Sequence, residues 1–229
     1  MSPTQSPEHV SPDDVSPESV SAEHRAEPSA EHYFSATSQS ELRTRQITVQ
    51  LAGLPREVVT ANAVFSPQHL DGGTEVLLKN IPEPPETGTF LDLGCGWGPI
   101  ALHLALSSPA ATVWAVDVNE RALDLVRANA ARLGLSNVIA ALPQDVPGDI
   151  RFDTIWSNPP IRVGKEVLHS IMLTWLPRLK ADTTAWLVVQ RNLGSDSLHR
   201  WLEAELPGDF EVTRDTISKG FRVLRVDRD

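Results

Sequence analysis

The sequence is poor in the features that mark secreted and membrane proteins. Of 229 residues only Cys95 is a cysteine, so no intramolecular disulfide can form. No apolar run approaches the roughly 18 residues of a membrane-spanning helix, and no apolar core follows a basic N-terminal start. We therefore expect a soluble, cytoplasmic protein without membrane contact. No His, Cys, Asp or Glu residues show metal-ligand spacing, so we also expect no metal site.

Basic residues are also in deficit, and the formal net charge is −10. Seven acids and one arginine lie in residues 1–31, whereas residues 32–229 hold 23 acids and 19 bases. Residues 1–31 are rich in Ser and Pro with isolated valines, which bury too little apolar surface to offset the entropy cost of ordering. We predict a disordered acidic tail there. A nucleic-acid partner would need a local basic patch on the remaining chain.

The rest of the chain divides into two parts. Residues 32–88 form an N-terminal segment with short strands expected at 47–51, 57–60 and 63–65 and a loop entering a helix at 70–78. In residues 89–229 strands and helices alternate, which predicts an α/β fold with a parallel, Rossmann-like sheet between helices on both faces. Strands are expected at 89–93, 112–116, 137–142, 152–156, 184–190, 210–213 and 221–226, and helices at 99–108, 119–134, 165–179 and 197–206. The last two strands lack a helix between them, which predicts an antiparallel C-terminal edge.

A glycine-rich turn follows the strand at 89–93. Gly94, Gly96 and Gly98 let the backbone turn tightly and approach a ligand without Cβ atoms in the way. Pro99 suits the first position of the following helix, where its missing N–H costs nothing. A strand, a glycine turn and a helix N-terminus together form a nucleotide-type pocket.

Two acidic residues help to define the ligand of this pocket. Asp117 ends the next strand, where a carboxylate can accept hydrogen bonds from both ribose hydroxyls, as it also would in a dinucleotide enzyme. The turn spacing G-x-G-x-G differs from the G-x-G-x-x-G that seats a pyrophosphate. Asp92 would repel phosphates but could order water or pair with an ammonium group. These features favour S-adenosylmethionine (SAM) over a dinucleotide.

Gln144 and Asp145 follow the third strand of the sheet. They would lie where an adenine ring needs a polar partner for its exocyclic amine. An ordinary turn before Pro147 explains Asp145 equally well.

The strongest chemical motif is Asn158-Pro159-Pro160, at the end of the fourth strand. The double proline fixes the backbone and keeps the Pro159 carbonyl out of a helix. That carbonyl and the Asn158 side-chain oxygen can accept both protons of a planar amine, which turns the nitrogen lone pair toward a bound electrophile. Because a methyl sulfonium is already activated, orientation and desolvation would supply most of the rate.

These motifs resemble the class I SAM-dependent methyltransferases and, more narrowly, the "methyltransferase small" family, which includes bacterial 16S ribosomal RNA (rRNA) guanine-N2 methyltransferases. The resemblance rests on segments spread over residues 32–227. They are His32–Phe34, Val64–Ser66, Leu70–Thr74, Asp92–Pro99, Asp117 and Asn158–Ile161.

The resemblance implies a seven-stranded sheet, SAM as methyl donor and Asn158-Pro159 as the amine clamp. It also implies that the segment from Phe65 to Thr74 folds over the methionine end of the donor. Known members often place an aromatic residue after the double proline, where this chain has Ile161. A base-stacking contribution of roughly 1–3 kcal/mol would then come from another aromatic residue. The candidates are Tyr33, Phe34, Phe65 and Trp97.

Basic residues near the clamp suggest how RNA would be held. Arg162 and Lys165 follow the clamp directly and could contact phosphates beside the target base, and Arg43 and Arg45 could extend that patch. The leading hypothesis is a SAM-dependent N-methyltransferase acting on guanine N2 of rRNA or the small ribosomal subunit. Methylation of a protein glutamine or a small-molecule amine, or a non-catalytic SAM-binding module, are the alternatives. The glycine spacing and the clamp disfavour a nicotinamide oxidoreductase.

Overall fold

The computed structural model describes residue 41 and residues 43–229. The predicted tail, Tyr33 and Phe34 lie outside these residues. The strands are β1 (Thr44–Leu51), β2 (Leu54–Ala61), β3 (Thr87–Leu93), β4 (Ala110–Val116), β5 (Val138–Ala141), β6 (Phe152–Ser157), β7 (Leu179–Gln190), β8 (Phe210–Ser218) and β9 (Phe221–Arg228). The α-helices are α1 (Gly72–Asn80), α2 (Pro99–Ser107), α3 (Glu120–Arg132), α4 (Lys165–Trp175) and α5 (Ser195–Glu205). Short 3₁₀ turns are η2 (Pro143–Asp145), η3 (Ile161–Val163), η4 (Leu176–Arg178) and η5 (Arg191–Leu193).

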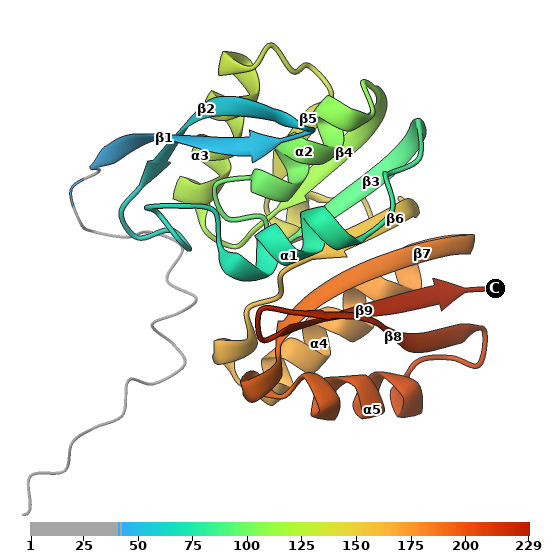
Figure 1. Cartoon of the computed structure of the whole chain (residues 1–229). Coiled ribbons are helices and arrows are strands. Elements are labelled where there is room, and N and C mark those ends of the chain that lie inside the picture. Colours follow the sequence, from blue (N-terminus) through green and yellow to red (C-terminus); the bar gives the residue numbers. More distant parts are fainter. Residues whose placement is uncertain (1–40, 42) are drawn as a thin grey trace, which may run out of the picture.

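Seven strands form one sheet in the order β5-β4-β3-β6-β7-β9-β8 (Figure 1). The strands from β5 to β7 are parallel, whereas β9 is antiparallel to both β7 and β8. The predicted seven-stranded α/β fold with an antiparallel C-terminal edge is therefore confirmed. The strand order reverses beside β3, so the carboxyl ends of β3, β4 and β6 surround the place where ligands bind in such sheets.

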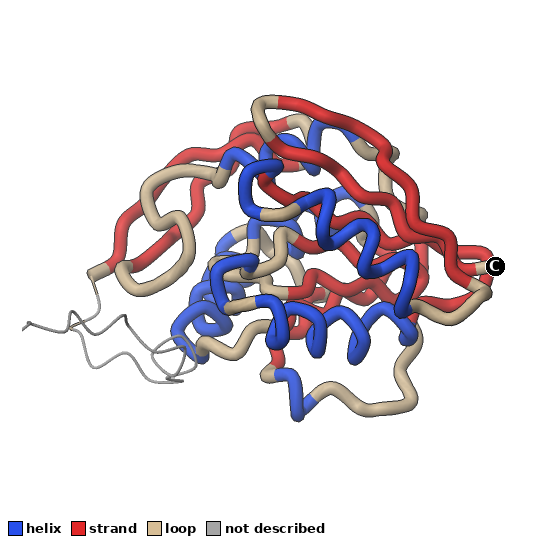
Figure 2. The backbone as a smooth tube through the Cα atoms, turned by 90° about the horizontal axis from the view of Figure 1, so that it is seen from below, coloured by secondary structure: helices blue, strands red, loops and turns tan. Residues whose placement is uncertain are grey.

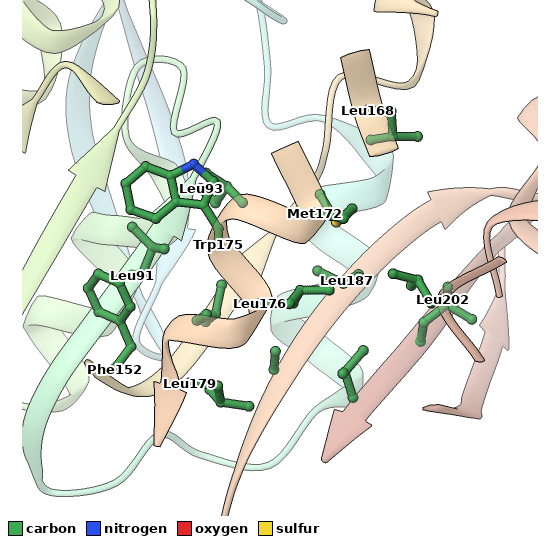
Figure 3. Packing of buried hydrophobic residues seen from close by; sticks show 14 of the residues in the cluster. Leu91, Leu93, Phe152, Leu168, Met172, Trp175, Leu176, Leu179, Leu187 and Leu202 are labelled. Atoms are coloured by element: carbon green, nitrogen blue, oxygen red, sulfur yellow. The ribbon is translucent and has the colours of Figure 1, made fainter. Parts of the chain in front are cut away.

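Helices cover both faces of this sheet. On one face α4 and α5 bury a cluster that includes Leu91, Met172 and Leu202 (Figure 3). On the other face α1, α2 and α3 pack against a cluster that includes Phe90 and Val188. Consecutive residues of β3 thus enter opposite cores, as expected for a parallel strand buried on both sides. Among the described residues, no helix is long and apolar enough to cross a bilayer.

The β1–β2 hairpin forms a separate two-stranded sheet that packs outside α2 and α3 (Figure 1). Asn129 of α3 is fully buried and bonds to the edge of β2 that does not face β1. Its Oδ1 accepts from Val59 N at 2.7 Å, and its Nδ2 donates to Val59 O at 2.9 Å. The same Nδ2 also donates to Trp97 O at 3.2 Å. The side chain of Asn129 therefore connects the hairpin to the glycine turn itself.

Several predicted elements differ from the structure; strand β8, for example, ends at Ser218, five residues beyond its expected end. Residues 63–65 form no strand but lie in the loop between β2 and α1, where Ala63 and Ser66 have positive φ angles of 60° and 47°. In Figure 2 this loop lies at the end of the molecule opposite to the C-terminus. The helix expected at 165–179 ends at Trp175 because Pro177 cannot continue it. Strand β7 begins at Leu179, five residues before the expected start, because Leu179 pairs with Phe152 of β6.

Candidate active site

The glycine turn between β3 and α2 adopts the conformation that its sequence predicts. Gly94, Gly96 and Gly98 have φ angles of 76°, 54° and 95°, a backbone region that residues with a Cβ rarely adopt. The amides of Gly94 and Cys95 donate to Val116 O at 2.8 and 3.0 Å, which anchors the turn to the end of β4. Pro99 is the first residue of α2, as expected.

Asp92 lies beneath this turn and is fully buried. Its Oδ2 accepts from Ala101 N at 2.8 Å in the first turn of α2, and no side chain or backbone group among the described residues donates to its Oδ1. Burial, with a smaller contribution from the neighbouring Asp117, raises the pKa of this carboxyl group to about 8, although the hydrogen bond from Ala101 N opposes the rise. Asp92 is therefore protonated at neutral pH, and its hydrogen bond from Ala101 N fixes the first turn of α2. Its expected contact with a bound cofactor stays a prediction.

Asp117, at the carboxyl end of β4, is tied to the glycine turn. Its Oδ2 accepts from Gly96 N at 2.9 Å and its Oδ1 from Asn119 N at 2.9 Å. Burial raises the pKa of this carboxyl group, and these backbone hydrogen bonds oppose the rise. Each carboxylate oxygen can accept a further hydrogen bond, so Asp117 retains the acceptors that its predicted role in binding a ribose requires.

The clamp motif lies beside the glycine turn because β3 and β6 are neighbours in the sheet. Leu93 pairs with Ser157, whose hydroxyl donates to Leu93 O at 2.7 Å. A Cβ added at Gly94 would lie 3.7 Å from Cδ of Pro160. The buried Pro159 has a carbonyl that accepts from Ile161 N at 2.8 Å, so only one of its two lone pairs is left for a substrate.

The loop between β2 and α1 closes the site from the other side. Phe65 is 62% exposed, and its Cβ would lie 3.9 Å from a Cβ at Gly96. One cavity is lined by this loop, the glycine turn, the start of α2 and the clamp. Its lining residues are Phe65, Ser66, Asp71, Thr74, Gly94, Cys95, Gly96, Trp97, Pro99, Ile100 and Asn158. The structure thus brings together five of the predicted site residues: Phe65, Thr74, Gly94, Gly96 and Asn158.

Asp71 and Thr74 hold the side chain of Asn158. The Asn158 Nδ2 donates to Asp71 Oδ2 at 2.7 Å and to Thr74 Oγ1 at 3.1 Å. The same Asp71 oxygen accepts from Gly73 N at 2.7 Å and Thr74 N at 3.2 Å, so Asp71 is also the N-cap of α1. Sequence reasoning gave Asp71 no role of its own. The signal that could have found it is its position immediately before a helix, where Asp is a preferred cap.

Other predicted residues lie away from the cavity wall. Gln144 and Asp145 are exposed in η2, at the carboxyl end of β5. The side chain of Ile161 packs against the core beneath α4 instead of standing free beside the clamp. Arg162 and Lys165 are exposed in η3 and at the start of α4.

The remaining candidates from the sequence also have defined places. Trp97 is 2% exposed and belongs to the core between the hairpin and α3, so it is not available for stacking on a base. Phe65 is the one stacking candidate among the described residues that is exposed. Arg43 and Arg45 are exposed at the end of the hairpin from which the cavity loop departs, where Asn62 N donates to Arg43 O at 3.2 Å.

Comparison with known proteins places this geometry in a family. The chain is 34% identical over 199 residues to the uncharacterized protein YbxB of Bacillus subtilis. That match covers 86% of this chain and 98% of the relative. It is 35% identical over 143 residues to the ribosomal RNA small subunit methyltransferase C of Pseudoalteromonas translucida. That match covers 61% of this chain but 41% of the relative, so the chain spans less than half of that enzyme.

A solved structure shows the same fold. The T. thermophilus 16S rRNA N2 methyltransferase, solved in complex with AdoMet and guanosine, superposes with a TM-score of 0.70 at 23% identity. The match covers 85% of this chain and 53% of that chain. The model of the methyltransferase small domain matches residues 55–225, which include the hairpin strand β2, the glycine turn and the clamp. The chain belongs to the methyltransferase small domain family.

Proposed function

We propose that this protein transfers a methyl group from SAM to an exocyclic amine held by Asn158 and Pro159, and that this amine is guanine N2 of small-subunit rRNA. SAM is the methyl donor of the family, and its sulfonium supplies an activated methyl group. The residues present fit such a donor. Gly94 and Gly96 face the cavity without a Cβ, and Asp117 keeps oxygen lone pairs for a sugar.

One observation carries the proposal: Asn158 lines the same cavity as the glycine turn. The Asn158 side-chain oxygen and the second lone pair of the Pro159 carbonyl can each accept a proton of an amine at this edge of the sheet. Accepting both protons fixes the plane of the amine and directs its nitrogen lone pair into the cavity. The chain's contribution is therefore orientation and exclusion of water, and no general base is required before methyl transfer. The nitrogen would lose one of its protons to water after it has gained the methyl group.

The choice of rRNA rests on relatives and on local charge. The methyltransferase C proteins that match this chain are named for small-subunit rRNA. Arg162 and Lys165 are exposed directly after the clamp, where they would meet phosphates next to a target base. A stacked base would have to be flipped out to reach Asn158, and the exposed Phe65 is placed to stack on it.

Mapping the methylated product tests this proposal. Labelled SAM is incubated with the protein and with small ribosomal subunits, naked 16S rRNA or total protein, each from cells that lack the protein. We expect label in rRNA, recovered as N2-methylguanosine after digestion to nucleosides. Label in protein glutamine or in a small amine would refute the rRNA assignment, and binding of NAD without binding of SAM would refute methyl transfer.

The Asn158→Ala variant tests the clamp. We expect turnover to fall at least about 10²-fold, as for the loss of a group that orients the reacting atoms. The affinity for SAM, measured by calorimetry, should stay within a few-fold of wild type because the glycine turn is intact. The exposed Asn192→Ala, in η5, is a control that should leave both quantities unchanged. Methyl transfer by Asn158→Ala at the wild-type rate would remove Asn158 from the mechanism.

A further inference from the structure

Asp71 makes a contact that helix capping does not require. As the N-cap of α1, its Oδ2 accepts from Gly73 N and Thr74 N at 2.7 and 3.2 Å, which satisfies two amides of the first turn. The same oxygen also accepts from Nδ2 of Asn158 at 2.7 Å, although the two residues are 87 positions apart in the chain. A shorter capping side chain such as serine would serve the helix and leave Asn158 without this partner.

This contact fixes which end of the Asn158 amide the protein holds and which end it leaves free. A carboxylate can only accept hydrogen bonds, so the end of the amide next to Asp71 has to be the nitrogen. The Thr74 hydroxyl, at 3.1 Å, takes the second proton of the same nitrogen. Both N–H groups of Asn158 are therefore used within the protein. Within residues 43–229 no protein group donates to Oδ1 of Asn158, which leaves that oxygen for a substrate.

We propose that Asp71 is a positioning residue for methyl transfer: it locks the Asn158 amide with its oxygen toward the acceptor amine. The inference rests on the proposed role of Asn158 as the acceptor of the amine protons. If the amide turned by 180°, its NH₂ group would face the NH₂ group of the substrate, and two donors cannot bond. The negative charge of Asp71 also polarises the amide, which makes Oδ1 a stronger acceptor.

The position of Asp71 links the orientation of Asn158 to the loop between β2 and α1, which lines the cavity. The residue ends the loop that carries Phe65 and begins α1, and Thr74 belongs to the first turn of that helix. Both loop and helix line the cavity together with the glycine turn. One oxygen of Asp71 therefore connects the end of the loop, the first turn of α1 and the side chain of Asn158.

Two substitutions at Asp71 separate positioning from capping. Asp71→Ser keeps a good N-cap for α1 but cannot reach Asn158. We expect kcat to fall about 10- to 100-fold, with the KM for the acceptor and the melting temperature close to wild type. Asp71→Asn can still accept from the helix amides and from Asn158, so it should recover most of the lost kcat. Equal losses for both variants, or a loss confined to the melting temperature, would overturn the proposal.

Nuclear magnetic resonance provides a readout that does not depend on activity. The side-chain NH₂ pair of Asn158, identified by its disappearance in Asn158→Ala, should exchange slowly with solvent and shift downfield in the wild-type protein. The pair should move toward ordinary values and exchange faster in Asp71→Ser. An unchanged pair would show that Asp71 does not hold the amide. If Asn158→Ala keeps full turnover, the proposed role of Asn158 in holding the amine fails, and the positioning role of Asp71 fails with it. If Asn158→Ala is inactive while Asp71→Ser has wild-type kcat, only the positioning role fails.

Discussion

Replacing Asp92 with asparagine should change how the stability of the protein depends on pH. Asp92 is fully buried, and burial raises its pKa from 3.8 to about 8. The unfolded chain loses this proton near pH 4, whereas the folded chain keeps it until about pH 8. Between these values the folded state binds more protons than the unfolded state, so a rise in pH destabilises the fold.

The structure sets the size of this effect. The stability should fall by about 1.4 kcal/mol for each pH unit in that window, and by about 6 kcal/mol across it. Such a loss is a large fraction of the roughly 5–15 kcal/mol that stabilises a typical domain. Below the window Asp92 is protonated in both states, and above it Asp92 is ionised in both, so the slope vanishes at either end. In Asp92→Asn the side chain is neutral at every pH and can still accept from Ala101 N.

Guanidinium chloride unfolding at pH 5, 6, 7 and 8 measures this difference. The stability of Asp92→Asn minus that of wild type should rise by about 4 kcal/mol from pH 5 to pH 8. Titrating groups that do not interact with Asp92 contribute equally to both proteins and cancel in the difference. Asp124→Asn is the matched control, because the Asp124 side chain is 75% exposed and pairs with Arg127 on the surface. Parallel pH profiles for wild type and Asp92→Asn would refute the argument that Asp92 is buried in its protonated form.

Two further predictions concern the glycine turn and the basic residues Arg162 and Lys165. Gly98→Ala should destabilise the fold by roughly 2–4 kcal/mol in denaturant unfolding, since its Cβ would meet Val126 Cγ2 at 2.9 Å and its φ is 95°. Gly134→Ala has a positive φ but open space, so it should cost only about 1–2 kcal/mol, and equal losses would contradict the role of Val126. Arg162→Gln with Lys165→Gln should leave unfolding unchanged and reduce the salt dependence of rRNA binding, by a slope of about 0.7–0.9 per lost phosphate contact. An unchanged slope would place the RNA elsewhere.

Local sequence signals predicted the parts of the fold that depend on neighbouring residues. The helix expected from residue 119 begins as α3, where Asn119 is the N-cap and its Oδ1 accepts from Arg121 N at 3.0 Å. Pro99 and the three glycines likewise lie where their backbone preferences suit them. The expected strand at 63–65 failed for the opposite reason. Its run of three apolar residues is a local feature, but a strand also needs a partner edge, and this segment instead bends over the glycine turn.

The sequence by itself determined the order of the elements, the glycine turn and the positions of Asp117 and Asn158 at strand ends. These follow from hydrophobic period, backbone preference and the rule that parallel strands end at one edge. Only the tertiary structure decided which polar atoms are free. Packing under α2 buried Asp92, a tight turn occupied one lone pair of the Pro159 carbonyl, and the position of α1 brought its N-cap Asp71 to Asn158. Such contacts join residues far apart in the chain, and no local pattern encodes their distance.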